Sequence, residues 1–240
     1  MWKEWVTPEI LDSRIWPRTA AIAERLWSPQ EVTDVASMYA RLDKVNWRLD
    51  GLGLTQRSGS FRMLHRMVGT DEISALRILA DIVEPVKDYT RMESVKGPWD
   101  FRAPLNHLVD AVSPESEAAR HFRDQVQAYI RSDYKDQAAE AQIRTLLTTW
   151  RDNDMKLRPS LQRSFLLLEV TPLSEDLSAL GAAGLQALDS LDKSEPSSEA
   201  WRTQELSLIE RARTPKASLL LMVVASVQQL IEASAGQTKK

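Results

Sequence analysis

Hydrophobic residues recur at intervals of three and four along most of this chain, which is the spacing of one face of an α-helix. Ile143, Leu146, Leu147 and Trp150 are a clear example. Stripes of the same kind predict helices over residues 35–52, 73–83, 119–130, 143–150, 177–191 and 220–231. Each stripe leaves charged residues on the opposite face, a pattern typical of helices that pack on other helices. We therefore expect a mainly all-α fold, either a helical bundle or a helical-hairpin array.

Breaks in the pattern mark where predicted helices end and begin. The first helix is expected to close at Gly51 and Gly53, because glycine readily adopts the left-handed conformation of a C-terminal cap. Ser113 and Pro114 suit the cap and first turn of a later helix. The only convincing strand signal lies in residues 1–6, where aromatic and β-branched residues come before a proline. One strand makes no sheet by itself, so little sheet is expected.

Composition supports a helical protein with a real core. The 240 residues include only eight glycines, and 43% of them are hydrophobic. The net charge of -3 comes from 31 basic and 34 acidic residues that are interspersed along the chain. Because a nucleic-acid partner requires a concentrated basic surface, we expect no binding to nucleic acid.

Several other classes of site are also disfavoured. The chain has no cysteine, which excludes disulfides, thiolate metal sites and a cysteine nucleophile. None of the three histidines has a second one three or four residues away, so neither a metal site nor another cofactor is predicted. The longest apolar stretch, residues 217–227, is shorter than the ~20 residues that span a bilayer, so no membrane partner is expected. The first residues do not resemble a signal peptide, and the sequence predicts no particular compartment.

The most specific pattern is at the N-terminus. Trp2 and Glu4 form a Trp-x-Glu motif, and the run LDSRIWPRTAAIAERLWSP follows from Leu11 to Pro29. Together they resemble the last strand and helix of the catalytic barrel in family 20 β-N-acetylhexosaminidases. The resemblance covers residues 1 to about 54 and implies the C-terminal end of an incomplete (β/α)8 barrel. Residues 55–240 would then form an α-helical C-terminal domain, and the break in the helical pattern near residues 54–60 agrees with this boundary.

The run after the Trp-x-Glu motif is best interpreted as architecture. Pro17 suits a helix start. The apolar side chains expected to lie against the barrel are Ala20, Ile22, Ala23, Leu26 and Trp27. The charged side chains expected to pair near its rim are Arg14, Arg18, Glu24 and Arg25.

Trp2 and Glu4 are the candidate substrate-binding residues. They are two positions apart, so on a strand their side chains point to the same side. An aromatic face covers the C–H surface of a sugar ring, and a neighbouring carboxylate accepts hydrogen bonds from two hydroxyls. The resemblance implies that Trp2 lines the pocket for the terminal N-acetylhexosamine and that Glu4 binds its distal hydroxyls. Without that resemblance, an aromatic anchor and a solvated carboxylate would explain the same two residues.

The catalytic Asp-Glu pair of the family has no counterpart in this chain. The resemblance implies substrate-assisted, retaining hydrolysis, in which the substrate's acetamido oxygen attacks the anomeric carbon and the glutamate protonates the leaving group. That pair follows a His-x-Gly-Gly sequence, which is absent here. Asp71 and Glu72 follow Val68-Gly69-Thr70 instead, and Thr70 as a helix cap with two acids in the first turn explains them structurally. We predict no catalytic residue, and hence no activity for the chain alone.

Two alternatives to this interpretation remain open. In the first, the chain is a free-standing helical interaction module whose N-terminal tryptophans dock on a partner protein. In the second, a separate polypeptide supplies the missing barrel portion and the two assemble. If the chain is a severed barrel end, one strand has no ladder partners, and residues 1–27 should be disordered or adhere to another surface.

Overall fold

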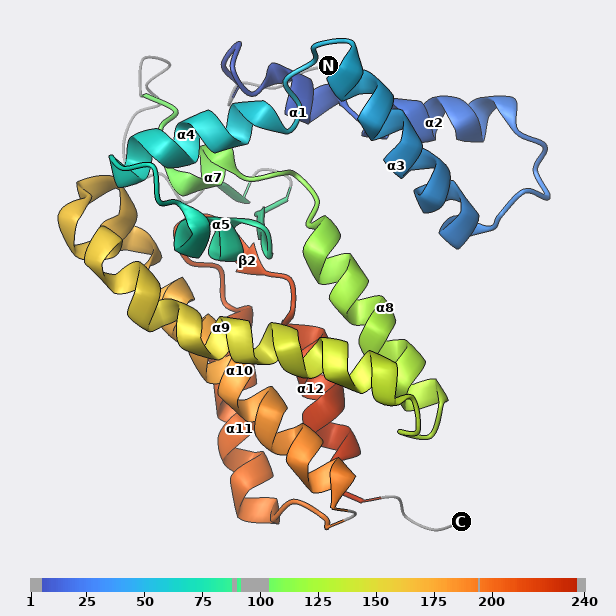
Figure 1. The fold of residues 1–240 in the computed structure, drawn as a ribbon, viewed down its shortest axis with the longest axis vertical. Helices are drawn as coiled ribbons and strands as arrows, with labels where there is room; N and C mark the ends of the chain where they lie inside the picture. Colours follow the sequence, from blue (N-terminus) through green and yellow to red (C-terminus); the bar gives the residue numbers. More distant parts are fainter. Residues whose placement is uncertain (1–5, 88–89, 92–103, 194, 237–240) are drawn as a thin grey trace.

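The structure is a computed structural model, and it describes residues 6–87, 90–91, 104–193 and 195–236. Figure 1 shows a helical protein, which confirms the predicted mainly all-α class. The N-terminal helices are α1 (Leu11–Ile15), α2 (Arg18–Trp27), α3 (Val35–Gly51), α4 (Ser58–Val68) and α5 (Ser74–Ala80). The remaining helices are α7 (Leu108–Ala111), α8 (Glu117–Arg131), α9 (Gln137–Arg163), the 3-10 helix η1 (Phe165–Val170), α10 (Thr171–Asp192), α11 (Glu199–Arg213) and α12 (Val224–Ala233).

The described chain from residue 55 onward, which includes helices α4 to α12, forms what we call the helical body. Its centre is the long pair α9 and α10. Helices α8, α11 and α12 pack around this pair (Figure 1). Gly181 and Gly184 on α10 face α9 so closely that side chains at these positions would collide with it. A Cβ at residue 181 would lie 2.6 Å from the backbone nitrogen of Arg151 and 2.6 Å from the carbonyl oxygen of Leu147. Gly181 therefore lets the two helix backbones come into near contact, and Gly184 makes room for the side chain of Leu147.

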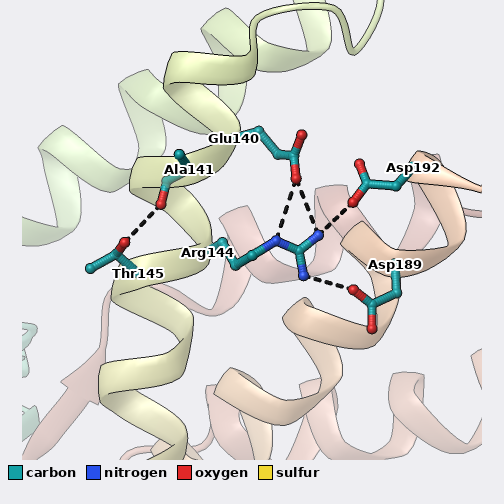
Figure 2. A network of polar contacts seen from close by, with 6 residues as sticks. All are labelled: Glu140, Ala141, Arg144, Thr145, Asp189 and Asp192. Carbon is teal, nitrogen blue, oxygen red and sulfur yellow. Dashed lines mark hydrogen bonds and ion pairs between the residues drawn. The ribbon is translucent and has the colours of Figure 1, made fainter.

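A charged cluster joins the same two helices near the C-terminal end of α10. Arg144 of α9 donates hydrogen bonds to Asp189 at 2.7 Å, to Asp192 at 2.6 Å and to Glu140 at 3.1 Å, as Figure 2 shows. Burial opposes the charge of Arg144, but the hydrogen bonds to Asp189 and Glu140 outweigh it and raise the pKa of the guanidinium above its ordinary value. One arginine thus holds three carboxylates together across the helix contact.

Two short strands correct the sequence-based assignment. Strand β1 (Val83–Pro85) and strand β2 (Leu219–Leu221) pair in antiparallel fashion, with Val83 opposite Leu221. The predicted helices over 73–83 and 220–231 therefore each lose one end, because Val83 and Leu220 belong to strands. The pairing joins segments far apart in the sequence, and strands of three residues leave almost no local pattern.

Two predicted helix caps were wrong in position. Ser116, not Ser113, caps α8, and its hydroxyl accepts a hydrogen bond from the backbone N–H of Ala119 at 3.0 Å. Helix α5 begins after Ile73 rather than after Thr70. The loop before α8 runs farther than Ser113 alone indicates, because tertiary contacts hold it. The hydroxyl of Ser116, for example, donates to the carbonyl oxygen of Asp81 at 2.5 Å.

The N-terminal helices divide into an anchored part and a projecting part. Helix α1 is hydrogen-bonded to the turn before α4, through Asp12, and to α7, through Arg14. Helices α2 and α3 lie side by side and extend away from the helical body (Figure 1). Ile10, just before α1, is 1% exposed and belongs to the same hydrophobic core as α9 and α10. Residues 1–27 were expected either to be disordered or to adhere to another surface. The described residues 6–17 lie against the helical body, which corresponds to the second expectation.

Candidate functional site

The predicted sugar-binding residues, Trp2 and Glu4, lie outside the described residues. The structure does describe the chain that follows them directly, starting at Val6, which packs against the core. The contacts of residues 6–18 with the helical body therefore fix the position of the chain directly after the predicted strand.

Glu9 makes the first contact, with helix α4. Its carboxylate accepts hydrogen bonds from two guanidinium nitrogens of Arg66, at 2.9 and 2.5 Å, and a longer one from Arg62 at 3.4 Å. The hydrogen bonds from Arg66 are the main reason that the pKa of Glu9 is lowered below its ordinary value. Bidentate pairing of this kind specifies direction as well as distance.

Gly59 and Asp12 bring the backbone close to the start of α4. A Cβ at residue 59 would lie 2.4 Å from the carbonyl oxygen of Glu9, so the N-terminal segment crosses α4 where only glycine fits. Asp12 accepts hydrogen bonds from the backbone N–H of Thr55 at 2.7 Å and from its hydroxyl at 2.9 Å. These contacts tie α1 to the turn that leads into α4.

Arg14 makes the deepest contact. It is 7% exposed and donates hydrogen bonds to the carbonyl oxygens of Asp110 at 2.8 Å and Val112 at 3.1 Å. Burial lowers the pKa of Arg14 to about 10, and the nearby charge of Asp110 partly offsets this effect. Arg14 was expected to pair near a barrel rim, but it instead enters the helical body, where it remains charged at neutral pH.

Two of the other charged residues of the run form ion pairs. Arg18 contacts Glu115, just before α8, at 3.3 Å, and Glu24 on α2 pairs with Arg41 on α3 at 2.5 Å. Arg25 instead donates to the backbone carbonyl of Val32 at 2.9 Å. The contacts of Glu24 and Arg25 stabilise the α2–α3 hairpin, and the contact of Arg18 joins its start to the helical body.

The α2–α3 hairpin exposes a large apolar surface. Leu26 is 78% exposed and Trp27 is 89% exposed, although both were expected to lie against a barrel. The other exposed apolar side chains of this hairpin are Ile22, Val32, Val35, Trp47 and Leu52. Soluble proteins rarely leave so many large apolar side chains uncovered in one region. Contiguous exposed apolar surfaces of this kind are typical of interaction sites.

A groove of about 490 Å³ lies between helices α1–α3 and the helical body. Trp16 and Tyr39 line it from the N-terminal side, and Phe61, Asp81 and Arg120 line it from the other. The guanidinium of Arg120 lies 3.9 Å from the ring centre of Tyr39, a cation–π contact that joins the two sides. The groove thus depends on the hairpin position.

Asp81 is the groove residue that sequence reasoning missed. Its side chain is 53% exposed, but the protein atoms on its other side reduce its hydration and raise the pKa of its carboxyl above the ordinary value, while Arg77 at 3.4 Å opposes this effect. No motif surrounds Asp81 in the sequence, and only tertiary contacts create its environment. A single such carboxyl differs from the Asp-Glu pair of the resembled family.

Glu72 has a structural role at the start of α5, but by a different geometry from the predicted Thr70 cap. Glu72 accepts a hydrogen bond from the backbone N–H of Ser74 at 2.9 Å, at the start of α5. This hydrogen bond helps to lower the pKa of Glu72 after a larger contribution from the Ser74 hydroxyl. Asp71 and Glu72 are both exposed and lie in the loop between α4 and α5.

Other kinds of site receive no support from the described part of the chain. Within residues 6–87, 90–91, 104–193 and 195–236, no three His, Asp or Glu side chains are arranged as metal ligands. His107 contacts Glu169 at 2.7 Å, and His65 contacts the carbonyl oxygen of Thr70 at 3.3 Å. None of the helices in these ranges is long and apolar enough to cross a bilayer.

Comparisons with known proteins agree on one family. The model of the glycosyl hydrolase family 20 catalytic domain matches residues 1–30. The β-hexosaminidase subunit β of Felis catus is 40% identical over 55 residues, which are 23% of this chain and 10% of that protein. The corresponding subunit of Mus musculus is 43% identical over 54 residues, again 10% of its length. The predicted family 20 resemblance is confirmed over this N-terminal region.

A solved structure extends the likeness beyond that region. The X-ray structure of Flavobacterium johnsoniae chitobiase superimposes with a TM-score of 0.84 and 32% sequence identity. The match covers 96% of this chain but 34% of the chitobiase chain. The helical part is therefore similar to part of a family 20 protein too. The chain spans about a tenth of the curated relatives and about a third of the chitobiase.

Proposed function

We propose that this chain is the C-terminal portion of a family 20 β-N-acetylhexosaminidase and is inactive alone. In the complete enzyme, terminal N-acetylhexosamine residues would be removed from glycoconjugates or chitooligosaccharides by substrate-assisted, retaining hydrolysis. The observation that carries this proposal is the chitobiase match, because it includes nearly all of this chain and only a third of its relative. The catalytic Asp-Glu pair would lie in the portion that has no counterpart here.

Within this proposal, Trp2 and Glu4 bind the terminal sugar. Trp2 covers the apolar face of the ring, and the Glu4 carboxylate accepts hydrogen bonds from its distal hydroxyls. Residues 1–54 would be the end of the catalytic barrel, and residues 55–240 would be an appended helical domain.

The exposed hairpin surface supports a missing barrel portion. Trp27 and Leu26 are almost fully solvated, yet they lie on the helix that the family model includes. In the proposed enzyme, the upstream barrel residues cover this surface and bury both side chains.

The first test is the mass and activity of the native gene product. We expect a product well above 27.2 kDa whose upstream peptides contain a His-x-Gly-Gly-Asp-Glu sequence. It should hydrolyse a chromogenic N-acetylglucosaminide, whereas the 240-residue chain should not. Activity in the isolated chain, or a native product of 27.2 kDa that starts at Met1, would contradict the proposal.

The second test concerns Glu4. Glu4→Gln removes the negative charge while keeping the size of the side chain, and we expect a large loss of kcat/KM in the longer product. Exposed Glu31→Gln is the matched control, since it makes the same chemical change on the loop after α2. Equal activity for the Glu4→Gln variant and the control would rule out the proposed sugar role. Activity that arises only when the chain is mixed with a separate barrel polypeptide would instead favour a two-chain enzyme.

A further inference from the structure

The helical body holds the segment after Trp2 and Glu4 at separate points. Glu9 pairs with Arg66 of α4 at 2.9 and 2.5 Å, and Asp12 accepts from the backbone N–H of Thr55 at 2.7 Å. Arg14 donates to the carbonyl oxygen of Val112 at 3.1 Å, in the loop after α7. Because these partners come from different parts of the helical body, they restrict both the position and the direction of the segment. We call residues 9–14 the anchor segment.

The anchor segment also fits α4 without spare room. Ile10 is 1% exposed, and its side chain is part of the central core. Gly59 lies against the carbonyl oxygen of Glu9, where an added Cβ would be 2.4 Å away. A carbon normally approaches a carbonyl oxygen no closer than about 3.3 Å, so a side chain at residue 59 would displace the backbone at Glu9 by about 1 Å.

The anchor segment is close to the predicted sugar-binding residues along the chain. Glu4 comes five residues before Glu9, and five residues of extended chain reach at most about 18 Å. A binding group has to be held to within about 0.5 Å of its productive position by the residues that support it. A displacement of about 1 Å in the anchor segment is therefore large enough to affect a sugar site built on Trp2 and Glu4.

We propose that the helical domain is a positioning element for the sugar-binding strand, and that it acts through Glu9, Asp12, Arg14, Arg66 and Gly59. This inference rests on the proposed function, and it gives the helical domain a role in that same site. These five are positioning residues, since Glu9, Asp12 and Arg14 hold the anchor segment on the helical body, Arg66 and Gly59 receive it there, and none of them is proposed to contact the sugar. The helical domain thereby sets substrate affinity without contributing a ligand to the substrate.

The experiment compares Gly59→Ala with Gly51→Ala. Both variants add one methyl group to a helix, but a Cβ at residue 51 meets no atom within 4 Å. Glu9→Gln is a milder third variant, which keeps the side-chain size and weakens the pairing with Arg66. The first readout is hydrogen exchange of residues 6–17 in the 240-residue chain, and the second is KM and kcat of the longer gene product on a chromogenic N-acetylglucosaminide.

We expect Gly59→Ala to accelerate exchange in residues 6–17 while α9 and α10 keep their protection. In the longer product, it should raise KM by about 10-fold or more with a smaller change in kcat, because ground-state sugar contacts are misplaced. Glu9→Gln should change both readouts in the same direction by less, and Gly51→Ala should change neither.

Two results would overturn the positioning role alone, and a third would overturn it together with the proposed function. Exchange of residues 6–17 in the unaltered chain at the rate of an unstructured peptide would mean that no anchor exists. Faster exchange in Gly59→Ala with an unchanged KM would mean that the anchor is structural only. A longer product with no hydrolase activity would refute the proposed function and the positioning role together, and the exchange data would still decide whether the helical body holds the segment.

Discussion

Replacement of Gly181 by alanine tests the close contact of α9 and α10. The new Cβ would lie 2.6 Å from two backbone atoms of α9, the nitrogen of Arg151 and the carbonyl oxygen of Leu147. Backbone atoms cannot rotate away as a side chain does, so α10 has to move by roughly 0.7–1 Å to restore normal contact. Gly181→Ala therefore strains the most extensive helix contact of the described structure.

The magnitude follows from two opposing effects. Overpacking of a core costs about 1–3 kcal/mol, and alanine in place of glycine within a helix returns about 0.5–1 kcal/mol. We expect a net loss of about 1–2 kcal/mol in the free energy of unfolding. For a chain of this length, each 1 kcal/mol lowers the melting temperature by about 2–4 °C.

The assay is urea denaturation followed by circular dichroism, with two other glycines for comparison. At Gly184 the added Cβ would meet only the side-chain tip of Leu147, which can change rotamer, so Gly184→Ala should cost less than Gly181→Ala. At Gly51 no atom lies within 4 Å, so Gly51→Ala should be neutral or stabilising. A midpoint for Gly181→Ala equal to or above that of the unaltered chain would refute the reasoning.

Three further predictions concern charge, pH and exposed surface. Arg144→Ala should lower the free energy of unfolding by about 1–2 kcal/mol, because Glu140, Asp189 and Asp192 then repel one another. Arg123→Ala is the control: its ion pair with Asp124 is half exposed, so the free energy of unfolding should change by less than about 0.5 kcal/mol. Equal urea midpoints for the two variants would contradict this prediction. Because the pKa of Glu9 is lower in the folded chain, its stabilisation of the anchor segment should be complete above its ordinary value of 4.5 and disappear as the pH falls through the lowered pKa. Exchange of residues 6–17, divided by the intrinsic rate at each pH, should show this loss in the unaltered chain, and a pH dependence that persists in Glu9→Gln would assign it to another group. Finally, the double variant Leu26→Glu, Trp27→Gln should bind less of a hydrophobic dye and aggregate less than the unaltered 240-residue chain. Its urea midpoint should not fall, since both side chains are more than three-quarters exposed. Unchanged dye binding would mean that the hairpin surface is covered in solution.

The helical fold was largely predictable from local pattern. The stripes over 119–130, 143–150 and 177–191 correspond to α8, α9 and α10, because each helix buries one face and the period of 3.6 residues is visible in the sequence. Helices α4 and α11 were not predicted. Helix α4 begins at Ser58, inside the stretch interpreted as a break, and α11 buries only a narrow stripe formed by Leu208, Ile209 and Ala212.

The candidate site divides in the same way. The Trp-x-Glu motif and the run after it were sufficient to predict the family, and the comparisons confirm that resemblance. The roles of Trp2 and Glu4 stay predictions. The support around them was not predictable, because Arg14 finds its partners 96 and 98 residues away and Gly59 is required by a carbonyl oxygen 50 positions earlier in the chain.

Local patterns were enough to predict most of the long helices, many of the residues that face the core and the enzyme family that the N-terminus resembles. Those properties depend on neighbours three or four residues away, or on a motif within one segment. The pairing of Val83 with Leu221, the burial of Arg14 and the exposure of Leu26 and Trp27 became visible only in the folded chain. These outcomes depend on which distant surfaces meet, and the free energy of such contacts depends on burial and geometry that no local spacing records.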